Sequence, residues 1–390
     1  MSSSERPITL EVRTHARISE IAKDDWNALV GEADSPFVEW DFLAALEDAG
    51  CVDARRGWQP CHFTLHDGGK LVAASPAYIK GNSEGEFVFD WSWADVAQRL
   101  GFDYYPKLIF AVPFTPATGA RVLRAPQYPM EQAAAAFREA SIQLAAQAEL
   151  SSVHVLFPTE AQSHSWQGPV HHERLGIQYH WHNNDYATFE DFLRRMPSKK
   201  RTQIRRERAQ LERDGVRLRV LEPQDLTPSV VKTMYELYLT TVDKFTWGRR
   251  YLNLRFFELL AERFAHRLSW TVAERDGKII ASAFNVQKGD RLYGRYWGSF
   301  VELPFLHFNV CFYHGIDHCI RHGLKVFEPG AGGEHKRVRG FVPTATRSVH
   351  YLRDPRMRTL VSDFLLRERA AITEHIEAER QGSGAAPDET

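Results

Sequence analysis

The sequence predicts an α/β protein built from two similar domains, each with a mixed sheet, that meet at a central cleft. Two observations lead to this prediction. At 390 residues the chain is longer than one ordinary domain, and one order of elements, β-hairpin, helix and strand, occurs in it twice. A hydrophobic content of 43% with 25% charged residues is typical of a soluble globular protein with a substantial core.

The repeated hairpins are expected at residues 67–95 and 276–300. Each segment has a Gly-Lys turn, an apolar strand, a polar Lys-Gly turn and then an aromatic-rich strand. The run Gly69–Ala73 aligns with Gly277–Ala281. Apolar runs bounded by such turns are hairpin signals. The alternative is a chance similarity between two short hairpins.

The elements that follow each hairpin favour duplication over chance. The first hairpin precedes an alanine-rich helix at 130–150 and a strand at 153–157, and the second precedes a helix at 305–322 and a strand at 326–327. Apolar spacing predicts one more helix at about 356–379. The resulting division is a first domain at 1–190, a basic connecting helix at 191–215, a second domain at 216–352, and a C-terminal helix with a disordered tail at 353–390.

Composition limits the possible partners and the compartment. The net charge of −1 gives no overall attraction to nucleic acid, so any anion site must be local. The four cysteines have no CxxC spacing, which indicates free thiols in a reducing compartment. The sequence has no apolar run near the roughly 20 residues that span a bilayer, and no signal core after its first residues. We expect a cytoplasmic protein that can also bind peripherally to the inner membrane.

A strongly basic segment lies between the two repeats. From Arg194 to Arg219 there are eleven Lys or Arg and three acids. Ser198 is a plausible N-cap and Gly215 a plausible end for a helix there. Such a helix is either a solvated face or an anion site for the phosphates of a nucleotide cofactor, a nucleic acid or a lipid headgroup. The candidate phosphate-binding residues are Lys199, Lys200, Arg201, Arg205 and Arg206.

The loop at 328–341 has the strongest pattern of functional residues in the chain. Small residues, mostly glycine, follow a short buried strand, and acid, imidazole and cationic side chains come directly after them. Glycine permits positive φ and close approach to a ligand, and open α/β sheets bind ligands beyond the ends of their strands. The alternatives are a solvated charged loop and a site that moves protons and stabilises an oxyanion.

Other reaction classes find less support in the sequence. It contains no G-x-S-x-G nucleophile elbow and no Walker A motif. His314, His318 and His322 share one face of a predicted helix, but a metal would need a further ligand from elsewhere. We therefore expect no metal site.

Four segments carry a resemblance to a known family. They are Phe89–Asp95, Tyr104–Lys107, Val112–Gly119 and Gly333–Phe341. In this order, with the duplicated unit and the basic helix, they resemble the FemAB-like branch of the GNAT acyltransferase superfamily over about residues 8–352. The most similar group is that of peptidoglycan biosynthesis or recognition proteins and predicted N-acyltransferases.

The resemblance implies two GNAT-like domains and transfer of an acyl group to an amine. Fem ligases take the acyl group from aminoacyl-tRNA and carry a lysine before an aromatic residue near the end of domain two, where Lys336 and Phe341 stand here. Simple GNAT enzymes bind coenzyme A on a glycine-rich loop, but residues 300–305 contain no glycine. The inserted coiled-coil arm of some Fem enzymes is also missing. Aminoacyl-tRNA, acyl-CoA and acyl carrier protein all remain possible donors, with no permanently bound cofactor.

For this chemistry we expect Lys336 to lie exposed in the cleft and to stabilise the oxyanion. Asp90, Glu334 and His335 are candidates for the base, and rings beside Asp90 are expected to raise its pKa. Structural hydrogen bonding by Asp90 and core packing by Tyr296 are the alternatives. The remaining candidates for substrate binding are Trp91, Trp93, Asp95, Tyr105, Lys107, Arg295, Tyr296, Arg339 and Phe341.

The acceptor is expected to be a lipid-like amine, as in ceramide synthesis, because aromatic residues are plentiful. One alternative is an aminoacyl-tRNA-dependent ligase for a peptidoglycan precursor. The other is a non-catalytic module that recognises a cell-wall or lipid fragment.

Overall fold

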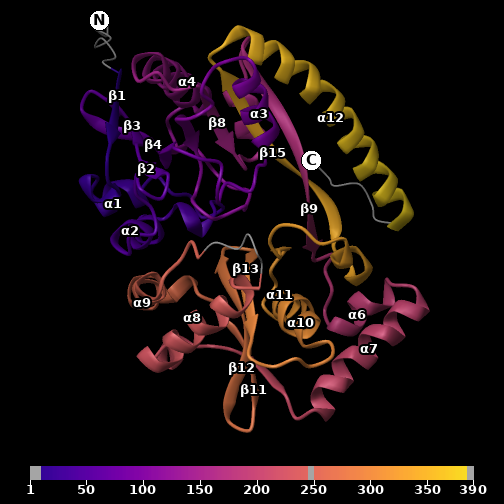
Figure 1. Cartoon of the computed structure of the whole chain (residues 1–390). Helices are drawn as coiled ribbons and strands as arrows, with labels where there is room; N and C mark the ends of the chain where they lie inside the picture. The colour runs from indigo at the N-terminus through magenta and orange to yellow at the C-terminus, as the bar shows by residue number, and fades with distance from the viewer. Residues whose placement is uncertain (1–9, 245–249, 384–390) are drawn as a thin grey trace, which may run out of the picture. The chain divides into compact units, whose positions relative to one another are not determined.

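The computed structural model describes residues 10–244 and 250–383. The end of the expected disordered tail, from residue 384, lies outside the described residues. The chain forms two compact units: unit 1 contains residues 1–176 and 346–371, and unit 2 contains residues 177–345 and 372–390. Each unit is therefore built from two separate stretches of the chain, whose colours can be followed in Figure 1.

Unit 1 contains a four-stranded sheet and part of a longer mixed sheet. The first sheet has the order β1-β3-β4-β7 and is antiparallel. The second has the order β15-β8-β6-β5-β2, and only β6 and β8 run parallel within it. The strands are β1 (Leu10–His15), β2 (Trp58–Pro60), β3 (His62–Asp67), β4 (Lys70–Ser75), β5 (Ala77–Lys80), β6 (Lys107–Phe110), β7 (Leu123–Arg124), β8 (Ser152–Leu156) and β15 (Val342–Leu352).

The helices of unit 1 bury small and aromatic side chains against these strands. The alanine-rich helix predicted from residue 130 forms as α4 and buries Ala133, Phe137 and Ala145 on one face. The described helices are α1 (Lys23–Asn27), α2 (Trp40–Asp48), α3 (Trp91–Arg99), α4 (Met130–Gln147), α5 (Glu160–Trp166) and the first part of α12 (Pro355–Ser383).

Unit 2 has one mixed sheet with the order β10-β11-β12-β13-β14-β9. All neighbours are antiparallel except β13 and β14. The strands are β9 (His171–His182), β10 (Arg217–Val220), β11 (Thr271–Arg275), β12 (Lys278–Lys288), β13 (Arg291–Ser299) and β14 (Val326–Glu328). The helices are α6 (Phe189–Arg194), α7 (Ser198–Arg213), α8 (Pro228–Val242), α9 (Leu254–Arg263), α10 (Leu306–Phe308) and α11 (His314–Arg321), with a π-helical turn at Asn309–Tyr313.

The two units repeat one strand sequence, as the hairpin pattern predicted. In each, an antiparallel hairpin turns at a Gly-Lys pair: Asp67 pairs with Lys70, and Arg275 pairs with Lys278. The strand after the hairpin then pairs in parallel with the strand that follows a helix, β6 with β8 in unit 1 and β13 with β14 in unit 2. The prediction of duplicated α/β domains with mixed sheets is confirmed.

The aromatic stretch before Asp95 is not a strand, which corrects the first hairpin. Trp91 begins helix α3, and the strand that pairs with β5 is β6, beyond that helix. Trp93 and Ala97, four residues apart, are buried together against Tyr104 and Leu352. This packing stabilises the helix and outweighs the preference of aromatic residues for strands.

The basic helix forms as α7 over Ser198–Arg213, close to the expected bounds. Its N-cap is Pro197, and the Ser198 side chain makes no capping bond, so the expected serine cap is wrong. Ile204 and Leu211 are buried as the thin apolar stripe, and Gly215 ends the helix with φ of +71°. Among the residues described, no helix is long and apolar enough to cross a membrane.

Helix α8 packs on β13 so closely that Gly298 has no room for a side chain. A Cβ there would lie 1.8 Å from the Leu237 carbonyl oxygen. We expect Gly298→Ala to lower the free energy of unfolding by about 1–3 kcal/mol or more, because backbone atoms must move apart. Urea unfolding followed by circular dichroism measures this. In the matched control, Gly81→Ala, the nearest atom lies 3.7 Å away, so equal losses in the two variants would contradict the packing argument.

Candidate functional site

In unit 2, the glycine-rich loop after β14 is held together by its own lysine. After β14 the chain passes Gly330, Gly332 and Gly333, which have φ values between +72° and +95°, and then forms a 3-10 helix at Glu334–Arg339. Positive φ of this kind favours glycine. The Lys336 Nζ donates to the carbonyl oxygens of Gly330 at 2.7 Å and Ala331 at 3.3 Å. The lysine therefore holds the turn that precedes it.

Lys336 is buried, which corrects the expectation of an exposed lysine. Only 4% of the surface of Lys336 is exposed. Burial lowers the pKa of Lys336 to about 8; the nearby Cys311 thiol opposes this shift and the Arg295 guanidinium adds to it. An ammonium has three N–H donors, and the third has no acceptor among the described residues.

A buried ion pair joins this loop to the basic helix. The Arg339 guanidinium donates to the Tyr313 hydroxyl at 3.0 Å and to the His335 carbonyl oxygen at 2.9 Å, and lies 3.6 Å from the Glu207 carboxylate. Tyr313 donates its hydroxyl hydrogen to the same Glu207 carboxylate. Glu207 is 1% exposed and Arg339 is 5% exposed. Arg339, expected to bind substrate, is thus placed as an internal anchor of the loop.

Aromatic rings cover the outer side of the lysine loop. The imidazole of the exposed His335 lies 5.7 Å from the ring of Phe312 and 6.0 Å from the ring of His307. The Arg339 guanidinium lies 3.3 Å from the centroid of Phe308. Phe341, another predicted site residue, is 1% exposed and belongs to the core of the unit. The side chain of Glu334 lies outside the described part of the chain.

A cavity of about 480 Å³ opens in unit 2 at the end of β13 and the start of α10. Its wall is mostly apolar. It includes His307 and Phe308, two of the aromatic residues that contact the lysine loop. The cavity and the lysine loop are therefore neighbours within this unit. The lining residues are Lys244, Trp297, Ser299, Val301, Glu302, Leu303, Pro304, Phe305, Leu306, His307 and Phe308.

Burial makes the His307 imidazole neutral near pH 7. Its side chain is half-buried, and burial, with the positive charges of Arg339 and Lys336, lowers its pKa to about 4. The ring of His307 lies 4.6 Å from that of Trp297. Neither ring nitrogen has a hydrogen-bond partner within residues 10–244 and 250–383.

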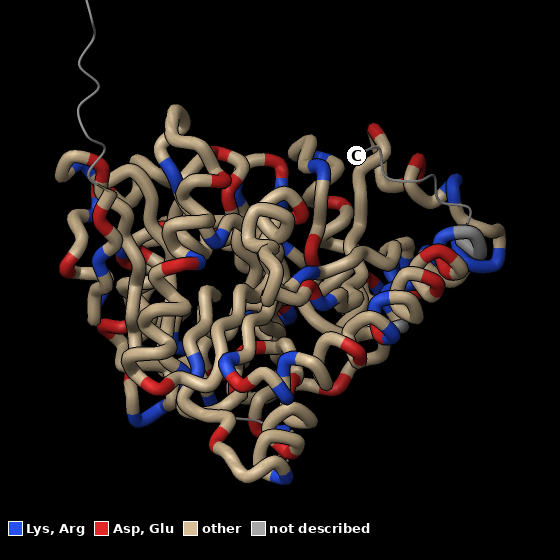
Figure 2. Tube along the Cα trace, turned by 90° about the horizontal axis from the view of Figure 1, so that it is seen from above, with Lys and Arg blue, Asp and Glu red and all other residues tan. Residues whose placement is uncertain are grey.

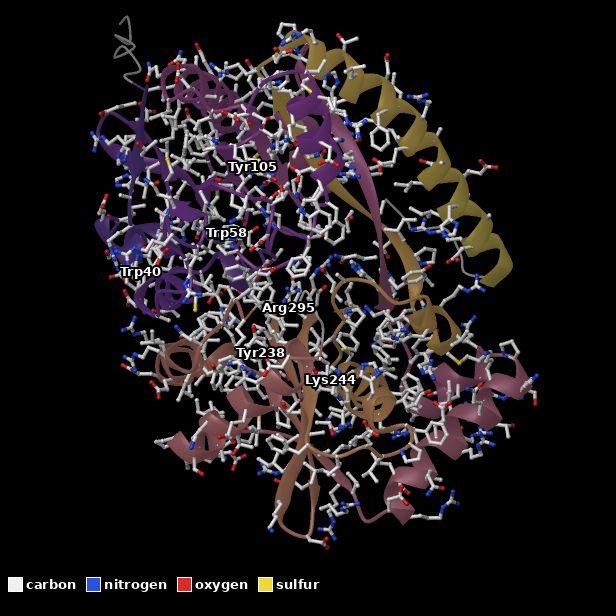
Figure 3. The ribbon with its side chains drawn as sticks, in the orientation of Figure 1. Trp40, Trp58, Tyr105, Tyr238, Lys244 and Arg295 are labelled. Atoms are coloured by element: carbon white, nitrogen blue, oxygen red, sulfur yellow. The ribbon has the colours of Figure 1, made fainter. Side chains whose placement is uncertain are left out.

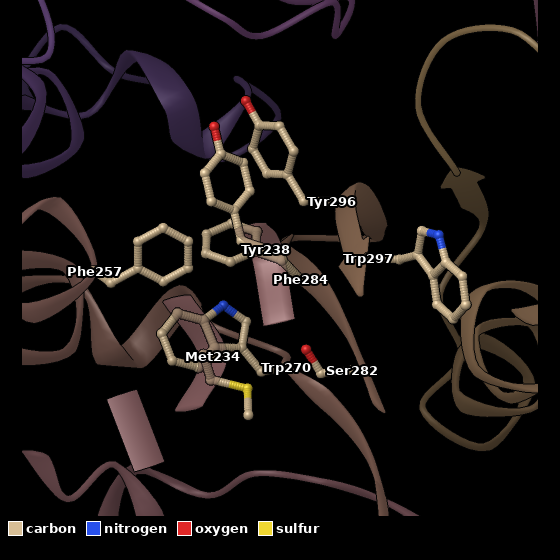
Figure 4. A pocket seen from close by; sticks show the side chains of 8 residues that line it. All are labelled: Met234, Tyr238, Phe257, Trp270, Ser282, Phe284, Tyr296 and Trp297. Atoms are coloured by element: carbon tan, nitrogen blue, oxygen red, sulfur yellow. The ribbon is translucent and has the colours of Figure 1, made fainter. Parts of the chain in front are cut away.

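Consecutive side chains of β13 point to opposite faces of the sheet. In Figure 4, Trp297 points away from the other side chains, while Tyr296 lies beside Tyr238 with the two hydroxyls at the same end. The rings of Tyr238 and Tyr296 are 5.0 Å apart, edge to face. The space among these rings is about 10 Å³, no more than one water needs. Tyr296 therefore packs in an aromatic cluster, the alternative that the sequence left open.

Arg295 precedes that cluster and lies in the neighbourhood of Lys336. Figure 3 labels it with Tyr238 and Lys244, all from unit 2. Burial lowers the pKa of the Arg295 guanidinium, and Glu328 opposes the shift. Its positive charge is one reason why the pKa of Lys336 is low.

Unit 1 contains a second cluster of buried charges, centred on Lys107. The ammonium lies 2.9 Å from the Glu86 carboxylate, 2.5 Å from the Asp90 carboxylate and 3.0 Å from the Ser83 hydroxyl. Tyr104 and Ser83 also donate to Asp90, at 2.6 and 2.5 Å. Lys107 and Asp90 have 0% and 2% of their surface exposed. These residues make a closed polar network in an apolar setting.

The network lowers the pKa of Asp90 instead of raising it. Burial alone would raise it, but the Lys107 ammonium, His154 and two hydrogen bonds bring the pKa to about 2. The expectation of a raised pKa is therefore wrong, because Lys107 contributes more than the neighbouring rings. The structural hydrogen bonds weighed as the alternative are the ones found.

Two further groups in this cluster are perturbed, and the sequence did not single them out. Burial raises the pKa of Glu86 to about 7, against the opposing Lys107 ammonium, and its Oε1 has no hydrogen-bond partner among the described residues. Burial lowers the pKa of Lys80 to about 7. The Lys80 ammonium lies 4.0 Å from the ring of Trp58.

The other predicted residues of unit 1 have differing surroundings. Trp91 is 56% exposed and its ring lies 5.0 Å from that of Phe89. Trp93 is 3% exposed and packs edge to face on His350 at 4.9 Å. Asp95 is exposed on α3, and the half-buried Tyr105 shares a hydrogen bond of 2.7 Å with Ser83.

The cations of α7 divide into paired and free groups. Arg205 forms an ion pair of 2.5 Å with Glu190, and Arg201 donates to the Met196 carbonyl oxygen at 2.9 Å. Within the described residues, the side chains of Lys199, Lys200 and Arg206 have no partner. Figure 2 shows basic and acidic residues interspersed along the described part of the trace, consistent with a net charge of −1.

The histidines at 314, 318 and 322 do not assemble a metal site. The His318 imidazole shares a hydrogen bond of 2.8 Å with Gln287, and its ring lies 4.3 Å from that of His322. Across the described ranges, no three His, Cys, Asp or Glu side chains gather in a way that could hold a metal ion.

Comparison with known proteins gives one family. The FemAB-like family model, described as peptidoglycan biosynthesis/recognition, matches residues 17–384. No curated protein matches the chain by sequence.

Several solved structures share the fold at low sequence identity. FemX is 11% identical with a TM-score of 0.53, and the match covers 88% of this chain and 98% of that chain. The C-terminal domain of a lysylphosphatidylglycerol synthetase from Agrobacterium fabrum is 11% identical with a TM-score of 0.53, covering 88% and 95%. L-PGS from Bacillus licheniformis is 11% identical with a TM-score of 0.51, covering 83% and 95%. These structures share the fold of this chain, with its two α/β units and mixed sheets.

The Lys107 network gives a stability prediction. We expect Lys107→Met to lower the free energy of unfolding at pH 7 by about 3–5 kcal/mol, because two buried carboxyl groups lose their counterion. In the wild type the contribution of Asp90 is present above its unfolded pKa of about 3.9 and is lost as pH falls through about 2. The difference in free energy of unfolding between wild type and variant should therefore become smaller as pH falls towards 4, because the carboxyl groups of the variant gain protons.

Urea unfolding of wild type and variant at pH 7 and pH 4.5 checks this. The exposed Lys70 supplies the control, since Lys70→Met should change stability by less than about 0.5 kcal/mol. A Lys107→Met protein as stable as Lys70→Met would mean that the network contributes nothing.

Proposed function

Because this chain belongs to the FemAB-like family, we propose that it transfers an acyl group from an activated donor to an amine and forms an amide. The observation that carries this proposal is the apolar cavity of about 480 Å³ beside the loop of the buried Lys336. Its volume lies within the roughly 300–1,000 Å³ of small-molecule sites. A transferase needs such a neighbourhood, with a binding surface for the donor and an N–H donor for the oxyanion.

In the proposed reaction the acyl group of the donor occupies the cavity. The wall is formed mainly by residues such as Leu303, Phe305 and Phe308, which suits a long apolar chain. Lys244, also in the wall, supplies a positive charge for phosphate groups of the donor. These features support an acyl thioester donor, although residues 300–305 lack the glycines of simple GNAT enzymes.

Lys336 is the proposed oxyanion donor. The amine nitrogen attacks the acyl carbonyl carbon, and negative charge develops on the carbonyl oxygen. The free N–H of the Lys336 ammonium then stabilises that charge, while Gly330 and Ala331 hold the other two. Collapse forms the C–N bond and breaks the bond to the thiol or alcohol of the donor. The nucleophile loses one proton and the leaving group gains one.

The proposed acceptor is a lipid-like amine. The apolar cavity favours it, and one structure of the same fold is named for lysylphosphatidylglycerol, an aminoacylated lipid. The free cations of α7 favour a second candidate, an aminoacyl-tRNA-dependent ligase for a peptidoglycan precursor, which agrees with the family description. A non-catalytic recognition module would need neither Lys336 nor its lowered pKa.

Mass spectrometry of a deletion strain separates these functions. Loss of an N-acylated lipid with unchanged muropeptides is the expected result. Altered muropeptides with unchanged lipids would replace the lipid assignment by the ligase. No change in either, with retained binding of a lipid or muropeptide by the purified protein, would indicate the recognition module.

Replacement of Lys336 tests the oxyanion role. We expect Lys336→Met to lower turnover by about 10²–10³ fold with little change in substrate binding, because the lost interaction forms mainly in the transition state. The ammonium form is needed, so wild-type turnover should fall as pH rises through about 8. Steady-state kinetics between pH 6 and pH 9 measures both effects.

Lys325→Met is the matched control for that variant. Lys325 is an exposed lysine of the same unit whose ion pair with Asp185 lies at the surface. Its loss should leave turnover unchanged. Full activity in a folded Lys336→Met protein would remove this residue from the mechanism.

Charge reversal on α7 tests the phosphate site. Because Arg206 is free and Arg205 is paired with Glu190, we expect Arg206→Glu to raise the KM for the donor more than Arg205→Glu does. The wild-type affinity should also weaken as salt rises. Titration of donor binding at low and high salt measures this. Unchanged affinity in a protein that carries both substitutions, Arg205→Glu and Arg206→Glu, would exclude α7 from binding.

A further inference from the structure

Aromatic rings hold the His307 side chain in the cavity wall. The His307 imidazole lies near three aromatic rings, with centroid distances of 4.6 Å to Trp297, 5.2 Å to Phe312 and 5.6 Å to Phe308. These contacts hold the imidazole by its faces and edges. Its two nitrogens have no hydrogen-bond partner in the part of the chain that the structure describes. The nitrogens are therefore left to bind water or a ligand in the cavity.

Two buried histidines of unit 2 do find partners, whereas the buried Nε2 atom of His314 has none among the described residues. His318 shares a hydrogen bond with Gln287 at 2.8 Å, and His180 shares one with Gln178 at 3.0 Å. Both are 8% exposed or less. His307 differs from them because it lies in the wall of an open cavity.

We propose that His307 is the acid–base catalyst of the acyl transfer, taking the proton of the attacking amine and returning it to the leaving group. This inference rests on the proposed function and names the group that moves its proton. The imidazole accepts the N–H proton as the C–N bond forms. It then donates that proton to the thiolate or alkoxide as the bond to the acyl carbon breaks. No further reactant is required.

The surroundings keep His307 in the form that a base requires. The charged and titratable groups that face it are His335, Lys336 and Arg339 from the lysine loop, and Lys244 and Glu302 from the cavity wall. Burial opposes protonation of the imidazole, and His335, Arg339 and Lys336 act in the same direction. The free base is therefore the resting form at neutral pH.

Lys336 and His307 then divide the work of the transfer. The same loop that carries Lys336 places His335 6.0 Å from the His307 ring, and Arg339 fixes that loop by its contact with Phe308. One group stabilises the oxyanion while the other moves the proton. Neither role requires Asp90, whose carboxylate is engaged by Lys107 and Tyr104 in unit 1.

The test uses palmitoyl-CoA as the donor probe and dodecylamine as the acceptor probe, with the amide measured by mass spectrometry. His307→Gln keeps the side-chain size and removes the base. It should lower kcat by about 10²–10⁴ fold with little change in KM for palmitoyl-CoA, and added imidazole should restore part of the rate. His322→Gln, an exposed histidine of the same unit, is the control and should keep full activity.

A second measurement needs no turnover. Diethylpyrocarbonate, which modifies neutral accessible imidazoles, should label His307 in the wild-type protein, and palmitoyl-CoA should protect it. Peptide mass spectrometry locates the label. Absence of labelling, or labelling that palmitoyl-CoA does not reduce, would overturn the placement of His307 at the donor site.

The outcomes separate this inference from the proposed function. Wild-type turnover that persists undiminished in His307→Gln overturns the role of His307 and leaves the transferase intact. A wild-type protein that forms no amide from these probes overturns the thioester form of the proposed function, and the catalytic role of His307 with it. Lost turnover without rescue, in a variant that no longer binds palmitoyl-CoA, makes His307 a binding residue and overturns catalysis.

Discussion

The lysine loop depends on one buried ion pair, that of Glu207 with Arg339. Glu207 comes from the middle of α7, Arg339 from the end of the 3-10 helix, and Tyr313 from the π-helical turn that precedes α11. A charge so deeply buried is tolerated only when it is paired, and loss of one partner costs about 3–5 kcal/mol in comparable cases. This pair therefore fixes the loop, the basic helix and the helix beside the cavity as one arrangement.

That arrangement explains why a basic helix with only a thin apolar stripe is stable. Ile204 and Leu211 bury little surface, and helix propensity alone supports a segment of this length poorly. The Glu207 carboxylate adds a specific attachment on the same face. The free cations then lie on the remaining faces, where they are solvated or bind anions.

The sequence predicted the architecture well because hairpin and helix signals are local. The Gly-Lys turns at Gly69 and Gly277 and the apolar runs beside them required no knowledge of distant contacts. The exception was the aromatic stretch near Trp93, whose helical state depends on Tyr104 and Leu352 elsewhere in the chain. Local pattern could not reveal that packing.

The site was less predictable, for an electrostatic reason. The sequence located the Lys336 loop from its glycines, but it could not show that the lysine is buried and held by two carbonyl oxygens. It also could not show that Lys107 lies 2.5 Å from Asp90 and reverses the direction of its pKa shift. His307 gave no signal of its own, since only the cavity around it distinguishes it from a packed histidine. A buried charge acquires its properties from neighbours that sequence spacing does not identify.

The division of each unit between two stretches of the chain affects how the protein is made. Strand β8 of unit 1 pairs with β15, which lies much later in the chain. His154 can therefore pair with His350 only after β15 has been made. Residues up to 345 complete the sheet of unit 2 before the last strand of unit 1 leaves the ribosome. Domains commonly fold during synthesis in N-terminal-first order. Here the unit translated first obtains its last strand, β15, after all the described strands of unit 2 have been made, and β8 lacks that partner until then.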